Sequence, residues 1–504
     1  MATLATVVYG LLSVPLALHF LSVEEFGLFM LLIQIAGYFS LVELGMAGAA
    51  ARILIDHKDN QISGLYGTLI LTGSIIFTIQ GLAVLLAGTL GASWLVSVAG
   101  VPPALQGSAA YLLAWLSASF AIGTVFRMLG AVLYANQRLD ILNLITAIGV
   151  LLALLTMALI LVSGGTLESL ATVFVLQVVL TILTQAFACW WLKLLPQKGC
   201  WGAPSLRCFF KLFQFAKDIF LINVGNQLLE GSQLIIVTKT MGLTAAAVWS
   251  VSTKLFNLFY QLLTRIEGTA VVFFSEMIVR GETARLRERF RQIYQLTAGL
   301  AVVALAFGVA TNRAFVSVWA EPSLAWGSSL NLLLAMLVFL NVLSRCFVDL
   351  LIHSKQLQAL RYVYFIEALA FVVMAILLAP SVGFYGILVS ALVCLALVRL
   401  WYTCWRVARY FDMPVVTFYW HWLKPALAAA LLLAPFVFLA EFLGAQLAQP
   451  LAGLLATVIC VGIPCGAILI SVALPKDVVR DAATALSGQM TSVLRKAGLV
   501  VRGA

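Results

Sequence analysis

Charged residues are scarce in this sequence. Of its 504 residues only 10% are Asp, Glu, Lys or Arg, whereas 63% are hydrophobic and the mean hydropathy is +1.07. Soluble globular domains carry about 25% charged residues. The composition therefore argues against a water-soluble fold and indicates a protein that crosses a membrane many times.

Signatures of metal sites and disulfides are also missing. The four histidines, His19, His57, His353 and His421, are scattered, and the eight cysteines form no C-x-x-C pair. These spacings predict no metal site. The predicted outer loops contain no cysteine, so we expect no disulfide bonds.

A phosphate-binding glycine-rich loop with its lysine is absent as well. The sequence thus predicts neither a nucleotide cofactor nor ATP hydrolysis by the protein itself. Any transport would have to run on an ion gradient, on the membrane potential or on withdrawal of the product.

Long apolar segments are what the sequence does contain. About 20 apolar residues span the hydrocarbon core of a bilayer, and we predict fourteen such segments: 2–21, 26–54, 62–91, 109–135, 139–163, 168–194, 218–241, 246–279, 292–313, 324–353, 356–380, 383–411, 424–443 and 450–474. The predicted fold class is an all-α polytopic membrane protein with about 14 transmembrane helices.

Basic residues gather after the even-numbered segments, for example Lys193, Lys198 and Arg207 after the sixth, whereas the odd-numbered exits carry only Lys239 and Arg313. Lys and Arg in short loops favour the cytoplasmic side. We therefore predict that both termini are cytoplasmic. The same topology accounts for the net charge of +10, so no nucleic-acid partner is expected.

Three short stretches recur at nearly equal offsets. Residues 20–29 are echoed by 240–249 at an offset of 220, and 136–139 and 163–165 are echoed by 354–357 and 381–383 at an offset of 218. This pattern predicts two parallel six-helix repeats with substrate between them at mid-membrane. The predicted domains are the halves 1–200 and 218–411, an amphipathic cytoplasmic linker at 201–217, two extra helices in 412–475 and an amphipathic cytoplasmic tail at 476–504.

Polar residues recur at helical spacing in two neighbouring segments. One face carries Lys254, Asn257, Gln261 and Arg265, and the preceding segment carries Asn223, Gln227, Glu230 and Gln233. Polar side chains at membrane depth usually face a bundle interior or a water-filled cavity, so we predict that these faces line one. The alternative is that Lys254 and Arg265 snorkel toward an interface.

Two arginines occupy equivalent places in the predicted repeats, since Arg127 and Arg345 are separated by 218 residues. Arg127 has no acid within one turn, whereas Asp349 follows Arg345 by four residues. Arginine pairs its planar fork with phosphate oxygens, which makes both residues candidate ligands for an anionic cargo. For Arg345 an intrahelical ion pair is the simpler alternative, and both side chains could snorkel.

A short turn, Ser22-Val23-Glu24-Glu25-Phe26-Gly27-Leu28-Phe29, precedes a long predicted helix that contains Glu43-Leu44-Gly45. In these residues, and in the order and spacing of its predicted helices over about residues 1–475, the chain resembles the polysaccharide and O-antigen flippases of the multidrug/oligosaccharidyl-lipid/polysaccharide exporter superfamily. Ser232-Gln233 departs from the acidic residue that such flippases often carry there.

The resemblance implies a flippase, not an enzyme, that moves a polyprenyl-diphosphate-linked oligosaccharide across the bacterial cytoplasmic (inner) membrane for lipopolysaccharide O-antigen or exopolysaccharide synthesis. Membrane lipids and other polysaccharide-assembly proteins would be its partners. Glu43, Glu230 and Asp349 are candidates for coupling or structural charges.

Two alternatives stay open. A multidrug extruder of the same superfamily usually has twelve helices and favours cationic drugs, which fits the basic stripe less well. A polytopic glycan polymerase or glycosyltransferase would be expected to place charged residues in a sizeable outer loop, whereas the longest predicted outer loop, residues 92–108, has no charge.

Overall fold

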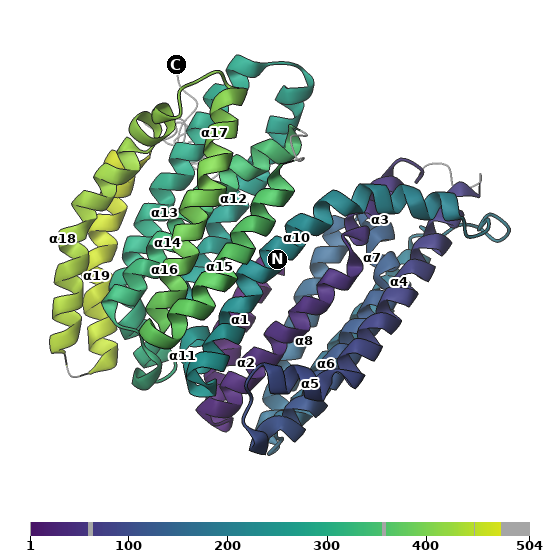
Figure 1. Ribbon diagram of the computed structural model, residues 1–504, viewed down its shortest axis with the longest axis horizontal. Coiled ribbons are helices and arrows are strands. Elements are labelled where there is room, and N and C mark those ends of the chain that lie inside the picture. Colours follow the sequence, from purple (N-terminus) through teal and green to yellow (C-terminus); the bar gives the residue numbers. More distant parts are fainter. Residues whose placement is uncertain (1, 59–63, 355–358, 448, 475–504) are drawn as a thin grey trace, which may run out of the picture. The chain divides into compact units, whose positions relative to one another are not determined.

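The computed structural model describes residues 2–58, 64–354, 359–447 and 449–474. Over these ranges the chain is almost entirely helical and contains no strand (Figure 1). The all-α prediction is confirmed. The predicted amphipathic tail at 476–504 lies outside the described residues, as does most of the echo at 354–357.

The described helices divide into two compact units. Unit 1 comprises Met1–Lys254, Trp319–Leu324 and Leu357–Cys394, and unit 2 comprises Leu255–Val318, Ala325–Gln356 and Leu395–Ala504. This division cuts across the predicted halves, because two late helices join the first unit. The boundaries of the sequence repeat stay a prediction.

Unit 1 contains α1 (Ala2–Phe20), α2 (Val23–Gly37), η1 (Tyr38–Glu43), α3 (Met46–Ile55), α4 (Leu65–Leu90), α5 (Ala92–Val98), η2 (Pro103–Leu105), α6 (Gln106–Val125), α7 (Arg127–Ala135), α8 (Leu139–Val162), η3 (Leu167–Leu170), α9 (Ala171–Trp191), α10 (Leu206–Met241), α11 (Leu243–Ser252), η4 (Pro322–Leu324), α15 (Leu360–Val382) and α16 (Phe384–Cys394). Helix α4 packs on α6, α1 on α8, and α10 on α15.

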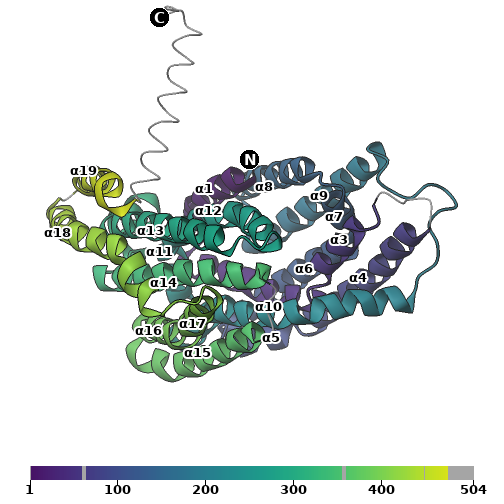
Figure 2. The ribbon, with the colours of Figure 1, turned by 90° about the horizontal axis from the view of Figure 1, so that it is seen from above.

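Unit 2 contains α12 (Lys254–Val279) apart from its first residue, α13 (Thr283–Trp319) apart from its last, α14 (Ser328–His353), η5 (Leu395–Leu400), α17 (Trp401–Tyr410), η6 (Thr417–Trp422), α18 (Lys424–Gln446), α19 (Pro450–Ile468) and η7 (Leu469–Ala473). Its core includes a cluster of aromatic rings from Phe290, Tyr294, Phe347 and Trp422. Helices α18 and α19 lie side by side in both views (Figure 2).

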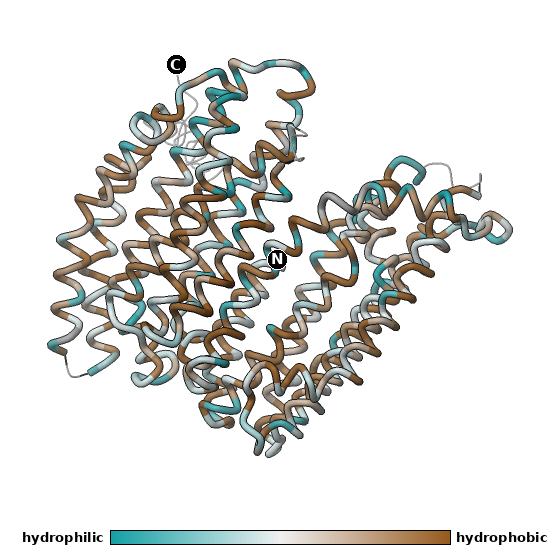
Figure 3. Tube along the Cα trace, in the orientation of Figure 1, coloured by the Kyte–Doolittle hydropathy of each residue, from teal (hydrophilic) through white to brown (hydrophobic). Residues whose placement is uncertain are grey.

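Twelve helical stretches among the described residues are long and apolar enough to cross a membrane. They match twelve of the fourteen predicted segments, and hydrophobic residues dominate their length (Figure 3). The chain is therefore a multi-pass membrane protein. The other two predicted spans, 218–241 and 246–279, are helical in α10 and in α11 with α12 but are more polar. The count of fourteen stays a prediction.

Helix continuity differs from the prediction in four places. The segment 26–54 breaks at Leu44 and Gly45, the segment 109–135 breaks at Phe126, and the segment 246–279 breaks at Thr253. Conversely, the separately predicted linker 201–217 and span 218–241 are joined, because α10 runs without interruption from Leu206 to Met241. Most of the predicted span residues that the structure describes are helical, but the positions of the breaks between helices differ from the prediction.

The Ser22 turn starts α2 with a capping box. The Ser22 side chain accepts a hydrogen bond from the Glu25 backbone N–H at 3.2 Å, and Glu25 Oε2 accepts one from the Ser22 N–H at 2.9 Å. This reciprocal pair satisfies two backbone donors at the helix start. Two residues later, Gly27 lets α2 approach α11, since a Cβ at Gly27 would lie 2.1 Å from the Leu243 carbonyl oxygen.

Candidate functional site

The predicted helix 26–54 is interrupted at the Glu43-Leu44-Gly45 step. Leu44 and Gly45 both adopt left-handed backbone conformations, with φ of 53° and 74°. A left-handed conformation costs a residue other than glycine about 1–2 kcal/mol. The surrounding structure therefore stabilises a break here, and Glu43 ends η1 directly before it.

A second break places Arg127. Helix α6 ends at Val125, Phe126 leaves the helical conformation, and Arg127 is the first residue of α7. Arg127 Nη2 donates a hydrogen bond to Glu43 Oε1 and forms an ion pair with it. The two breaks are thus joined by opposite charges that lie 84 residues apart. Arg127 lacks an acid within one turn of its own helix, and Glu43 supplies one from a separate segment.

Arg127 keeps hydrogen-bonding capacity beyond this pair. Its side chain is 40% exposed, whereas that of Glu43 is 12% exposed. Its Nε atom is buried, and it finds no hydrogen-bond partner among the described residues. The guanidinium carbon lies 6.0 Å from the centre of the Phe120 ring. Arg127 is held in place by Glu43 while part of the guanidinium remains available.

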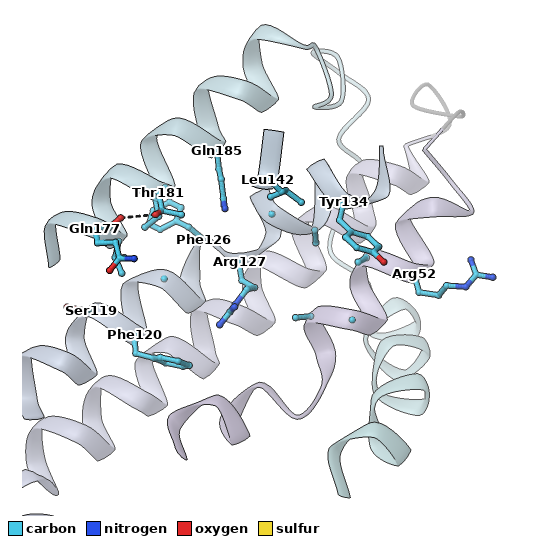
Figure 4. Close-up of a pocket in the computed structure, with 18 of the residues that line it drawn as sticks. Arg52, Ser119, Phe120, Phe126, Arg127, Tyr134, Leu142, Gln177, Thr181 and Gln185 are labelled. Atoms are coloured by element: carbon cyan, nitrogen blue, oxygen red, sulfur yellow. Dashed lines mark hydrogen bonds between the residues drawn. The ribbon is translucent and has the colours of Figure 1, made fainter. Parts of the chain in front are cut away.

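The available side of Arg127 opens on a cavity of about 800 Å³ within unit 1 (Figure 4). We call this the Arg127 cavity; α3, α6, α7, α8 and α9 form its walls. Its polar lining includes Arg52, Arg127, Tyr134, Gln177, Thr181 and Gln185. Arg52 at its edge is already paired with Asp56 at 2.8 Å. Both arginines of the lining therefore pair with an acid, and Arg127 is the one placed on the wall by a helix break.

Glu43 borders a second cavity of unit 1, with a volume of about 390 Å³. Residues of α10 line its other side, namely Asn223, Asn226, Gln227 and Glu230. Three members of the predicted polar stripe, Asn223, Gln227 and Glu230, are thus brought together with Glu43. Ala47 and Gly48 of α3 line both cavities, so the Glu43–Arg127 pair lies where the two adjoin.

The other predicted stripe lies on one face of α12. Asn257, Gln261 and Arg265 are exposed on that face, and Lys254 is half-buried at the start of the helix. The Lys254 side chain lies against α1, because a Cβ added at Gly10 would be 3.1 Å from Lys254 Cε. The shared face agrees with the prediction, while its contact with a water-filled cavity stays a prediction.

Arg345 forms the intrahelical ion pair that the sequence offered as its simpler role. Its Nε atom lies 3.0 Å from Asp349 Oδ1. A residue that the sequence reasoning missed is close by: Glu267 of α12 is 3% exposed, and its Oε1 accepts a hydrogen bond from the Cys346 thiol at 3.1 Å. Its Oε2 has no hydrogen-bond partner within the described residues. An acid in the middle of a predicted membrane span was the available signal.

No group of three or more His, Cys, Asp or Glu residues is placed to hold a metal ion in the described ranges. What these ranges offer instead is an arginine aimed at a cavity in a helical membrane bundle. The sequence from residue 17 to residue 321, more than half of the chain, matches the family described as "Polysaccharide biosynthesis protein". The chain belongs to this family. Among curated protein sequences none matches it significantly.

Solved structures place this polysaccharide biosynthesis family member in a known fold. It is similar to the structure described as "Lipid II flippase MurJ, inward closed conformation", with a TM-score of 0.71, 12% identity and coverage of 92% of this chain and 96% of that one. It is also similar to a "multidrug resistance MATE family transporter of the MOP superfamily" in an inward-facing conformation, with a TM-score of 0.68, 14% identity and coverage of 81% and 95%.

A third similar structure is a MOP superfamily transporter from Pyrococcus furiosus, with a TM-score of 0.55, 14% identity and coverage of 82% of this chain and 92% of that one. At these identities the comparisons establish the fold of this family member and nothing finer. The predicted membership in a polysaccharide biosynthesis family is confirmed.

Proposed function

We propose that this protein flips an oligosaccharide linked to a polyprenyl diphosphate from the inner to the outer leaflet of the bacterial cytoplasmic membrane, for the synthesis of cell-surface polysaccharide. The observation that carries the proposal is Arg127, which is anchored by Glu43 at the wall of a cavity of about 800 Å³. The diphosphate of the carrier is anionic, and a guanidinium binds phosphate oxygens with paired hydrogen bonds.

The physical reason for such a cavity is the cost of moving a polar headgroup through hydrocarbon. Polar groups inside a membrane need partners, and these are found toward a bundle interior or a water-filled space. The polyprenyl tail needs no such shelter and stays in the bilayer. In this proposal the protein is a transporter without catalytic activity, both of its termini are cytoplasmic, and membrane lipids and other polysaccharide-assembly proteins are its partners.

Family membership supports a polysaccharide-related cargo. The MurJ structure belongs to a flippase of lipid II, which gives a precedent for lipid-linked cargo on this fold. The fold shared with a multidrug transporter favours drug extrusion as the second candidate. An arginine that borders the cavity suits an anion better than the cationic drugs that such extruders favour.

Reconstitution tests the proposal directly. The full-length protein is placed in vesicles with a fluorescent polyprenyl-diphosphate-linked glycan, and a quencher that cannot enter the vesicles measures exchange between leaflets. We expect translocation that empty vesicles lack. A protein that moves cationic dyes and leaves the glycan lipid in place would overturn the proposal in favour of the extruder.

A further inference from the structure

Helix α9 turns a polar stripe toward the Arg127 cavity. Gln177, Thr181 and Gln185 follow one another at four-residue spacing, which keeps them on one side of an α-helix, and all three line the cavity (Figure 4). The opposite side carries large exposed apolar residues such as Leu183 and Phe187. In a helix that is otherwise apolar enough to span a membrane, the polar groups are thus concentrated where the cavity is.

Among the described residues, the side chains of the two glutamines of this stripe have no hydrogen-bond partner. Thr181 donates its hydroxyl hydrogen to the Gln177 backbone carbonyl at 2.8 Å, a bond within the helix. Across the described residues, however, the amide groups of Gln177 and Gln185 make no side-chain hydrogen bond. Gln80 differs, because its Nε2 donates to the Glu43 carbonyl oxygen at 3.3 Å, and so does Gln233, which donates to Leu229 at 2.8 Å.

A primary amide offers two donors and one acceptor. Leaving its hydrogen bonds unmade in an apolar setting costs free energy. The amides of Gln177 and Gln185 therefore need water or a ligand in the cavity. A partner that accepts and donates at closely spaced positions would satisfy them best. Hydroxyl groups do both.

The remaining walls of the cavity are aromatic or small. Phe120, Phe126 and Tyr134 contribute rings, and Phe126 and Tyr134 are 45% and 49% exposed. Gly48 has no heavy atom within 4 Å of where its Cβ would be, so it leaves space. Apolar rings with a few placed polar groups are the usual composition of a small-molecule site. Sugars present both hydroxyl groups and apolar C–H faces, which such a wall can match.

We propose that the Arg127 cavity holds the glycan of the cargo, with the amides of Gln177 and Gln185 bonded to sugar hydroxyl groups and the aromatic side chains against the sugar ring. This inference rests on the proposed function and adds a glycan subsite to it. The ligand class is a neutral, hydroxyl-rich sugar next to the diphosphate, for which Arg127 is the cation. Recognition of the sugar is thereby separated from recognition of the charge.

Binding to two probes tests the subsite. Full-length protein in lipid nanodiscs is titrated with polyprenyl diphosphate carrying the glycan of the host strain and with polyprenyl diphosphate that carries no sugar. We expect wild-type protein to bind the glycan-bearing probe at least tenfold more tightly. The double variant Gln177→Leu/Gln185→Leu should lose that preference and keep its affinity for the bare probe.

Two controls accompany this titration. Gln292→Leu removes a half-buried glutamine of α13, whose amide is hydrogen-bonded to Arg289 and Glu288 and which is far along the chain from the cavity, and should leave both affinities unchanged. Gly48→Leu fills the cavity from α3 and should lower the affinity for the glycan-bearing probe more than that for the bare one. Equal thermal stability of the variants shows that they fold.

The outcomes are distinct. Equal affinity of the wild type for both probes overturns the glycan subsite and leaves the proposed function standing. A wild type that binds neither probe overturns both. If the double variant loses affinity for both probes together, the subsite is also overturned, because the glutamines would then bind the carrier or stabilise the fold.

Discussion

Arg127 and Glu43 pair across two helix breaks, each at the residue where its helix begins or ends. Glu43 is largely buried and Arg127 is not. Glu43 therefore holds the guanidinium in place, and the exposed part of Arg127 faces the cavity. One charge is structural and the other is left partly available. This arrangement is the basis for the prediction on Arg127.

Arg127→Ala should abolish glycan export at normal protein abundance, because the cavity loses its available cation. Arg127→Lys should rescue export only partly, since the charge survives and the bidentate fork does not. The measurement is surface glycan in a deletion strain that expresses each variant. Arg138→Ala is the matched control, because Arg138 also pairs with an acid, Asp140, but lies outside the cavity lining. Wild-type export by Arg127→Ala would remove Arg127 from the site.

Gly27→Ala should destabilise the protein strongly, because its Cβ would lie 2.1 Å from the Leu243 carbonyl oxygen and α2 would have to move away from α11. Gly107→Ala is the control, since nothing lies within 4 Å of its Cβ position in α6. That change should leave stability unchanged or raise it slightly, because Gly107 lies in the first turn of α6. Thermal unfolding in detergent measures both. Equal melting temperatures would contradict the close approach of the two helices.

Glu267→Gln should keep or raise thermal stability, because the amide oxygen can still accept from the Cys346 thiol and a buried carboxylate is no longer required. The control is Glu276→Gln, which changes an exposed acid paired with Arg280 on the same helix and should shift stability by no more than about 0.5 kcal/mol. A marked loss of stability in Glu267→Gln alone would show that the charged form is needed. Glycan export measured in parallel shows whether Glu267 matters for transport.

Topology can be tested with single cysteines at exposed positions. Arg285→Cys on α13 should react with a reagent that cannot cross membranes only after the cells are opened, whereas Ser97→Cys on α5 should react in intact cells. The reason is the distribution of Lys and Arg, which assigns the first position to the cytoplasm and the second to the outside. Labelling of Arg285→Cys in intact cells would reverse the predicted orientation.

The helix rhythm could be predicted because membrane spans are long, apolar and separated by polar turns. The predicted span 139–163 and α8 (Leu139–Val162), for instance, differ by a single residue. The breaks at Gly45 and Phe126 could not be predicted, because both flanks are apolar and helix-compatible. What stabilises them is tertiary: the partner of Arg127 lies 84 residues away.

Parts of the candidate site were visible in the sequence and still missed. Gln177, Thr181 and Gln185 show their four-residue spacing in the sequence alone, but an uncharged stripe is a weaker signal in a membrane span than the charges at Lys254 and Arg265. Glu267 lies outside that stripe on α12, so the helical spacing of the stripe does not include it. The stripe itself was recovered as an exposed face, but the sequence could not say which cavity a given face borders.

The uninterrupted helix α10 ties together two parts that the sequence separated. Its 36 residues extend about 54 Å along the helix axis, well beyond the roughly 30 Å of hydrocarbon in a bilayer. The segment 206–216 therefore belongs to the same continuous α-helix as the residues that border the smaller cavity, Asn223, Gln227 and Glu230. The predicted linker is therefore helically continuous with one wall of the smaller cavity, without a flexible joint between them.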